Sequence, residues 1–235
     1  MKKFMKTLCC LAILTTSSYA QTHHAVYNYH FTDNEPLDLP NDQIIYPNDL
    51  VKNNPVHLFF DHQHSYYISE NNLNGNKNLS DSDIVASTYY PIFYYADIDK
   101  FHYNYLFNNT ELVVAIDDLT VQWEITDETQ VIDGYQCVKA IGKSKKLYAK
   151  SNDYHTYEAW FSPELPYAYG PSKFSGLPGL VIHGIEDGNK VFQLEKITSD
   201  TSIQMDDFAL IEAKEMNIQT IAQESMKMVE TVVNH

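Results

Sequence analysis

Short runs of alternating hydrophobic and polar residues recur along most of this chain. The first is Val26–Phe31, in which three aromatic residues alternate with Asn28 and His30, the period-two pattern of a half-buried strand. Further strands are expected at Val56–Phe60, Ser65–Ile68, Glu111–Ile116, Thr120–Ile125, Gln130–Ile141, Tyr154–Phe161, Leu180–Ile185 and Lys190–Ile197. No long helical pattern separates these runs, which disfavours a doubly wound parallel sheet.

The last two runs are joined by Glu186-Asp187-Gly188-Asn189, whose composition is typical of a hairpin turn. Neighbouring strands connected in this way pair antiparallel. The pattern therefore predicts a mainly β protein built on a single antiparallel, meandering sheet.

Two regions depart from the strand pattern. Residues 71–87 are polar and asparagine-rich, and we expect a loop there. From Asn217 to Val233 apolar residues recur at helical spacing, and Asn217 is a suitable N-cap, so this stretch is predicted to be an amphipathic C-terminal helix.

The first twenty residues have the features of a secretory signal peptide. Three lysines precede an apolar run at Leu8–Leu14, and Ser18-Tyr19-Ala20 is a cleavage sequence of small residues. We expect residues 1–20 to be removed after Ala20, and residues 21–235 to form one domain without repeats or linker. The expected location is the periplasm, with secretion or association with the outer membrane as alternatives.

Charge and cysteine content narrow the possible partners. The chain carries a net charge of −15 and has no arginine, so it offers no basic patch for nucleic acid. The charge favours solubility or a cationic partner.

Cleavage would leave Cys137 as the one cysteine, and its apolar neighbours predict a buried thiol without a disulfide.

A glycine- and proline-rich segment, residues 170–181, demands a specific backbone shape. In Leu177-Pro178-Gly179-Leu180 we expect a type II turn, with a positive φ at Gly179, while Gly176 allows close backbone approach. Trp160 ends the preceding strand. The segment is interpreted as a rigid corner packed on Trp160, with a backbone ledge for a ligand as the alternative.

This segment and the strands before it resemble the GLPGLI family of small exported proteins of Gram-negative bacteria. The resemblance rests on Trp123, Ile125-Thr126, Ile132, Gly134-Tyr135, Cys137, Lys139-Ala140, Ala159-Trp160-Phe161, Gly170-Pro171, Phe174 and Gly176-Leu177-Pro178-Gly179-Leu180-Val181. It implies a curved β sheet, bowl-like or half-barrel, of unassigned function, and an association with outer-membrane TonB-dependent receptors. A similar bowl-like domain precedes the catalytic part of a bacterial peptide-N-glycanase, which implies an accessory module. No catalytic residues come with the resemblance.

An aromatic stripe is the first candidate contact surface. Phe101, Tyr103, Tyr105 and Phe107 alternate along one predicted strand and would share one face. Tyrosine combines a large contact area with a polar tip, which suits peptide or sugar binding. The alternative is a face that packs on the core.

Histidines provide the second candidate site. His62 and His64 lie close to His57 in sequence and could together hold a transition metal. After cleavage, the terminal amine of Gln21 and the imidazole of His23 could bind Cu or Ni in a square plane. Scattered surface histidines and a cyclised Gln21 are the competing interpretations.

Three hypotheses about function follow. The first is a non-catalytic exported module that binds a protein or peptide partner in the cell envelope, without a cofactor. The second is a periplasmic copper- or nickel-handling protein. The third is a hydrolase with an unrecognised site, since the chain has no nucleophile elbow, zinc-helix motif or phosphate loop.

Overall fold

The structure is a computed structural model that describes residues 21–39, 43–52, 55–70, 93–97, 100–107, 110–115, 121–146, 153–200, 205 and 214–217. For residues 93–115 it describes the backbone of the strands. Within these residues the chain is mainly β, with one short helix, α1 (Pro47–Val51). No described helix has the length and apolarity needed to cross a membrane.

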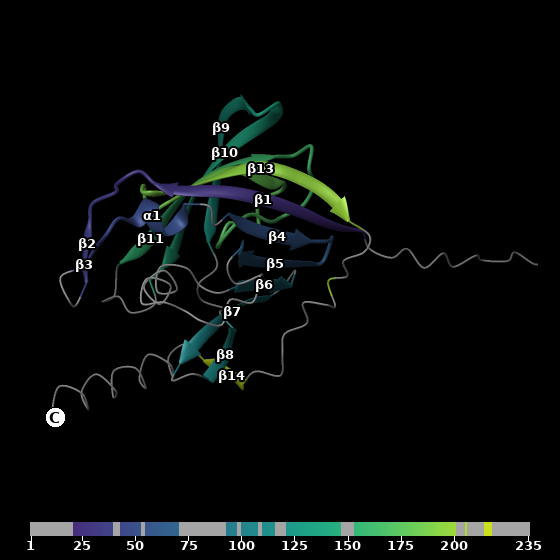
Figure 1. Ribbon diagram of the computed structural model, residues 1–235. Coiled ribbons are helices and arrows are strands. Elements are labelled where there is room, and N and C mark those ends of the chain that lie inside the picture. Colours follow the sequence, from purple (N-terminus) through teal and green to yellow (C-terminus); the bar gives the residue numbers. More distant parts are fainter. Residues whose placement is uncertain are drawn as a thin grey trace, which may run out of the picture.

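Twelve strands form one open sheet in the order β14-β8-β7-β6-β5-β4-β1-β13-β12-β11-β10-β9 (Figure 1). Its strands are β1 (Thr22–Phe31), β4 (Val56–Phe60), β5 (His64–Ser69), β6 (Phe93–Asp97), β7 (Lys100–Phe107), β8 (Thr110–Ala115), β9 (Gln122–Ile132), β10 (Tyr135–Lys145), β11 (Tyr154–Ser162), β12 (Leu180–Glu186), β13 (Lys190–Asp200) and β14 (Lys214–Asn217). Every pair is antiparallel except β14 with β8. A separate hairpin consists of β2 (Leu37–Leu39) and β3 (Gln43–Ile45). The prediction of an antiparallel, mainly β chain is confirmed.

The hairpin of β9 and β10 was divided wrongly by the sequence pattern. The predicted strand Gln130–Ile141 is broken by a two-residue turn at Asp133 and Gly134, whose φ angles are 48° and 87°. Positive φ at both turn residues is typical of type I′ hairpins. The turn at Asp187 and Gly188 has the same character, with φ of 53° and 67°, and confirms the predicted hairpin between β12 and β13.

The predicted C-terminal helix is not supported. Asn217, the expected N-cap, is the last residue of β14, which lies beside β8. The rest of that prediction, residues 218–233, lies outside the described residues, as do the expected leader and the asparagine-rich loop at 71–87.

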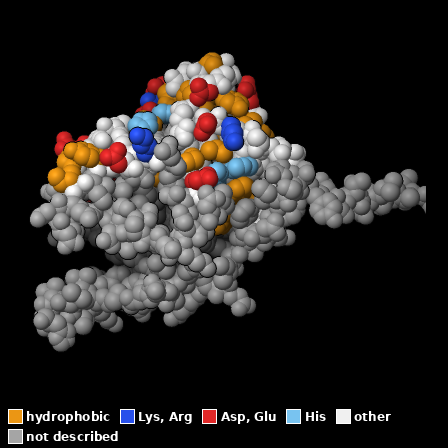
Figure 2. All heavy atoms as spheres, in the orientation of Figure 1, with side chains coloured by type: hydrophobic (Ala, Val, Ile, Leu, Met, Phe, Trp, Pro, Cys, Tyr) orange, Lys and Arg blue, Asp and Glu red, His pale blue; other side chains and the backbone are white. Residues whose placement is uncertain are grey.

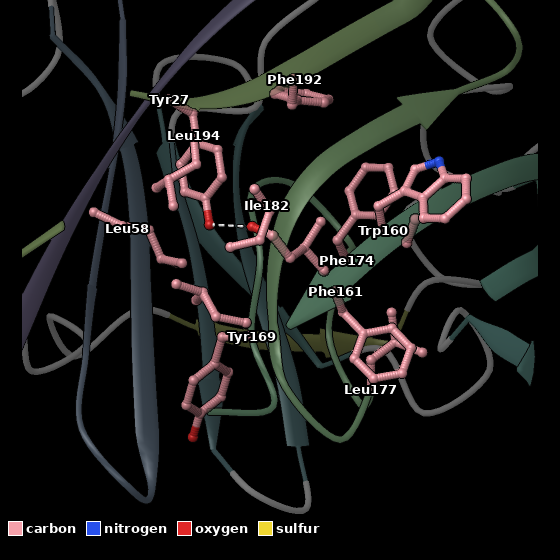
Figure 3. Packing of buried hydrophobic residues seen from close by; sticks show 14 of the residues in the cluster. Tyr27, Leu58, Trp160, Phe161, Tyr169, Phe174, Leu177, Ile182, Phe192 and Leu194 are labelled. Carbon is pink, nitrogen blue, oxygen red and sulfur yellow. Dashed lines mark hydrogen bonds between the residues drawn. The ribbon is translucent and has the colours of Figure 1, made fainter. Parts of the chain in front are cut away.

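The main core lies on one face of the sheet, where β1, β4 and β10–β13 contribute their inward side chains (Figure 3). Cys137 belongs to this core, and the prediction of a buried free thiol is confirmed. Burial raises the pKa of the Cys137 thiol. A smaller cluster of Phe59, Ile68 and Met205 lies apart from the main core. Because β4 contributes side chains to both clusters, it is buried along its whole length.

The glycine- and proline-rich segment covers the main core and inserts Phe174 into it. The Phe174 ring is fully buried and packs against Trp123, Tyr157 and Phe192, with centroid distances of 6.0, 5.4 and 5.9 Å. The ring fits because Gly184 of β12 has no side chain, since a Cβ there would lie 2.9 Å from it. The segment therefore closes the core, and its role as a rigid corner stays an interpretation.

Two glycines of this segment have roles that differ from those expected. Gly176 has the positive φ, at 87°, whereas Gly179 is not among the residues with positive φ, so the predicted type II turn at Leu177–Leu180 is wrong. The Gly179 amide instead donates to the carbonyl oxygen of Leu177 at 2.8 Å, a three-residue turn. Gly179 is needed for space, because a Cβ there would lie 2.3 Å from the Ser162 carbonyl oxygen.

The tryptophan bonded to this segment is Trp123. Its indole N–H donates to the Ser175 carbonyl oxygen at 2.8 Å. Trp160 lies in the main buried cluster together with Phe174 and Leu177, but its indole N–H points to Glu158 and Lys139 lies over its ring. The other motif residues hold the segment's shape: the Pro171 carbonyl oxygen accepts from the Phe174 amide, and a Cβ on Gly170 would strike Phe174.

Candidate functional site

A pocket of about 310 Å³ opens where β1 begins and β13 ends. Antiparallel pairing sets His23 opposite Ser199, and the loop that follows β11 passes beside them. The walls are formed by His23, Glu164, Leu165, Pro166, Tyr167, Ile197, Thr198 and Ser199. Three segments far apart in the sequence therefore meet in one concave site.

His23 bonds two of these segments together. Its Nε2 lies 2.6 Å from the Tyr167 hydroxyl, and its Nδ1 lies 3.1 Å from the Ser199 hydroxyl. A neutral imidazole has one donor and one acceptor nitrogen, and a hydroxyl can take either role, so both contacts suit the neutral ring. Burial, with a smaller contribution from nearby His62, lowers the pKa of His23.

The Tyr167 ring packs against three other rings beside the pocket. It stacks on His62 at a centroid distance of 5.3 Å and meets Phe60 edge-on at 4.9 Å, while the His23 ring lies 4.7 Å away. Burial raises the pKa of the Tyr167 hydroxyl. The ring is therefore held in one orientation beside the pocket, with a neutral hydroxyl at its tip.

A second histidine group lies around β1 and β4. His24 Nε2 is 2.8 Å from His57 Nδ1, and the other ring nitrogen of His57 contacts the Glu70 carboxylate. His24 also stacks on Phe59 at 4.3 Å. In Figure 2 histidine side chains lie beside acidic ones over the region where β1 and β4 run together in Figure 1. The carboxylate orients His57, which in turn orients His24.

The predicted metal ligands are not brought together. His57 is held by His24 and Glu70, whereas His62 stacks on Tyr167. The amide N–H of His64 bonds to Asp61, a hydrogen bond within the turn between β4 and β5. Among the described residues no three histidine, cysteine or acidic side chains gather as a metal would require. Gln21 precedes β1, and His23 inside that strand is bonded to Tyr167 and Ser199.

The predicted aromatic stripe lies on β7, next to β6 in the sheet. The pairing register sets Tyr103 opposite Tyr94, and Tyr94 opposite Tyr67 of β5. The side chains of Phe101, Tyr103, Tyr105 and Phe107 lie outside the described residues, so their contact role stays a prediction.

The local sequence pattern does not predict this pocket. It indicates His23 as a metal ligand and gives no reason to connect His23 with Tyr167 or Ser199. The contacts between them join positions 144 and 176 residues apart. The one local signal is Glu164-Leu165-Pro166-Tyr167, in which an aromatic residue follows a proline in a loop next to a strand end.

Comparison with known proteins supports the family and the fold. Residues 142–183 match the model of a family described as a protein of unknown function (Porph_ging), which is the GLPGLI-type family. The predicted resemblance is confirmed over this segment, which contains β11, the glycine- and proline-rich segment and the start of β12. No curated protein matches the chain in sequence.

Two solved structures of PNGF-II, in the C2 and P21 space groups, resemble this chain. They are 17% and 18% identical to it, with TM-scores of 0.57 and 0.58, and both matches cover 87% of this chain. This chain spans 32% and 33% of the length of those chains, about a third. At this identity the likeness concerns the fold alone.

Proposed function

We propose that this chain, which matches the GLPGLI-type family over residues 142–183, is an exported, non-catalytic binding module for a protein or peptide partner in the cell envelope. The observation that carries the proposal is the pocket at the ends of β1 and β13. Three separate segments form it, and hydrogen bonds through His23 hold Tyr167 and Ser199 in place. A binding site of fixed shape needs no moving part and no catalytic group.

The pocket suits one or two side chains of a peptide better than a large ligand, because 310 Å³ is at the small end of ligand-pocket volumes. Leu165, Ile197 and the Tyr167 ring offer apolar contact, while Glu164 supplies a carboxylate. A segment with an apolar or aromatic side chain next to a lysine or arginine fits this chemistry. The net charge of −15 also favours a cationic partner, and the family resemblance suggests a TonB-dependent receptor.

Site-specific photo-crosslinking tests the proposal in cells that export the protein. A benzophenone amino acid at Thr198, on the pocket wall, should give a discrete crosslinked product that disappears in Tyr167→Ala. The same amino acid at Lys145, which is exposed on β10, should not give that product. Identical products from both positions, or none from Thr198, would contradict a pocket-centred binding role.

One contact favours a second candidate, a hydrolase. The Ser199 hydroxyl lies 3.1 Å from His23 Nδ1, and the lowered pKa of His23 keeps a neutral ring that can accept its proton. A fluorophosphonate probe, which reacts with activated serines, distinguishes the two candidates. Labelling of Ser199 that is lost in His23→Gln supports the hydrolase, whereas an unlabelled Ser199 is the result that the binding module predicts.

The aromatic stripe on β7 provides a further contact surface in this proposal. Replacing Tyr103 and Tyr105 by alanine should weaken partner binding without unfolding the chain. Loss of cooperative thermal unfolding in that variant would instead assign these tyrosines to the core.

A further inference from the structure

Among the described strands, β9 is the last of the sheet, and one of its two edges has no strand beside it. Its pairing partner is β10, and no described residue forms a backbone hydrogen bond with the opposite edge of β9. The hairpin of β9 and β10 extends beyond the body of the sheet at the top of Figure 1. An edge of this kind presents unpaired N–H and C=O groups to a passing strand.

Apolar side chains are exposed along this hairpin. Val131 and Ile125 of β9 are 59% and 51% exposed, and Ile141 of β10 is 45% exposed. Figure 2 shows hydrophobic side chains interspersed with acidic ones over the hairpin. Exposed apolar residues on an edge strand supply the side-chain contact that strand addition requires.

The acidic residues on β9 restrict which strand can bind. Asp127 and Glu128 lie at a bulge, where Thr129 pairs with Val138 but Ile125 already pairs with Ala140. The Glu128 carboxylate is paired with Lys139 of β10 at 3.4 Å, so Asp127 carries the charge selection at this edge. Beyond the bulge, Thr129–Ile132 keeps a regular register with β10. A second copy of β9 placed antiparallel on this edge would bring acidic residues together, which destabilises cross-strand pairs. A strand that carries lysines would meet opposite charge instead.

We propose that the open edge of β9, along Thr129–Ile132, is a docking site for an extended, lysine-bearing segment of a partner protein, which adds to the sheet as a further strand. Backbone hydrogen bonds supply affinity, Val131 supplies apolar contact, and Asp127 selects the charge of the partner. This site is separate from the pocket at the ends of β1 and β13 and does not depend on it.

The experiment uses the full exported chain and a short acetylated peptide that alternates lysine and valine. Within Thr129–Ile132, the amides that face away from β10 should exchange with solvent about tenfold more slowly in its presence, as followed by NMR or mass spectrometry. A peptide of alternating glutamate and valine, and a lysine–valine peptide with a central proline, should give no protection.

A matched pair of charge reversals separates edge binding from general attraction to an acidic protein. Asp127→Lys should weaken binding about tenfold, equivalent to about 1.4 kcal/mol, because it places a lysine against the peptide. Glu195→Lys makes the same change of charge at an exposed position on β13, inside the sheet, and should alter affinity by about twofold or less. Tyr167→Ala should leave the protection of the Thr129–Ile132 amides by the peptide unchanged, because this readout is local to β9 and Tyr167 lines the separate pocket.

Three results would overturn the proposal. The first is unchanged exchange of Thr129–Ile132 with the lysine–valine peptide. The second is equal weakening by Asp127→Lys and Glu195→Lys, which indicates non-specific attraction. The third is protection of the same amides by protein concentration alone, which indicates that a second copy occupies the edge.

Discussion

The Tyr27 hydroxyl donates a hydrogen bond of 2.7 Å to the carbonyl oxygen of Val181, 154 residues later in the chain (Figure 3). β12 pairs with β13 from His183 onward, so Val181 precedes that ladder, and its carbonyl oxygen accepts from a side chain of β1 instead. Both residues are fully buried. This bond joins the first strand to the end of the glycine- and proline-rich segment across the core.

Removing this hydroxyl should destabilise the fold. In Tyr27→Phe the Val181 carbonyl oxygen stays buried but loses its donor, which costs about 1–3 kcal/mol. Urea unfolding monitored by tryptophan fluorescence measures the loss. Tyr154→Phe, at a tyrosine that is 42% exposed, is the matched control and should change stability by about 0.5 kcal/mol or less. Equal effects in the two variants would show that the buried bond contributes nothing.

Alkaline pH should also weaken the fold through this residue. Burial raises the pKa of the Tyr27 and Tyr157 hydroxyls above the ordinary value of 10.0. Above pH 10 the unfolded chain therefore loses these protons more readily than the folded chain, and the free energy of unfolding falls as pH rises. In Tyr27→Phe this decline should be shallower. Urea unfolding at a series of alkaline pH values checks it, and parallel slopes in the two proteins would contradict the assignment.

The strands were predictable because alternation is a local property. β4 (Val56–Phe60) has the predicted bounds, and β5, β11 and β12 differ from the predictions by one residue at one or both ends. The pair β9 and β10 failed for a local reason as well. Asp133-Gly134 interrupts an otherwise strand-like run, and the apolar pattern on both sides obscures this turn signal.

The pocket and the role of Gly179 could not be read from local pattern. His23 meets Tyr167 only because β13 lies beside β1 and the loop after β11 returns to their ends, an arrangement set by the whole sheet. Gly179 was expected to provide a positive φ, but its requirement is steric and comes from Ser162, seventeen residues earlier in the sequence. Long-range contact of this kind leaves no periodicity in the sequence.

The two kinds of glycine in this chain should respond differently to alanine. Gly179→Ala sets a Cβ against backbone at Ser162, which cannot move aside, and should cost about 3 kcal/mol or more. Gly134 has a φ of 87° and open space around it, so Gly134→Ala meets only the backbone penalty of about 1–2 kcal/mol. Denaturant midpoints of the two variants rank the effects. If Gly134→Ala is the more damaging change, the steric account of Gly179 is wrong.

The lowered pKa of His23 predicts how the stability of the fold changes at acidic pH. The unfolded chain binds a proton at this imidazole near its ordinary pKa of 6.5, whereas the folded chain binds it only at lower pH. Stability from this residue is therefore present above pH 6.5 and is lost as pH falls through the folded pKa. An NMR titration of the His23 ring should give a midpoint below 6.5 in the folded chain and near 6.5 in urea. Equal midpoints would show that the pocket wall does not disfavour the charged ring.

Substitutions at Gly184 and Phe174 should have non-additive effects on the free energy of unfolding in a double-mutant cycle. Gly184→Ala alone forces a Cβ to within 2.9 Å of the Phe174 ring, which cannot shift because Trp123, Tyr157 and Phe192 surround it. Phe174→Leu alone leaves a cavity in the same place, at a cost of about 1–3 kcal/mol.

In the double variant the new methyl group occupies part of the space that the ring has left, so the two costs offset one another. The combined loss in unfolding free energy should fall below the sum of the single losses by about 1 kcal/mol or more. Urea unfolding of the four proteins measures this coupling. Additive losses would mean that the absence of a side chain at Gly184 is not what admits Phe174, and that the glycine- and proline-rich segment closes the core by other contacts.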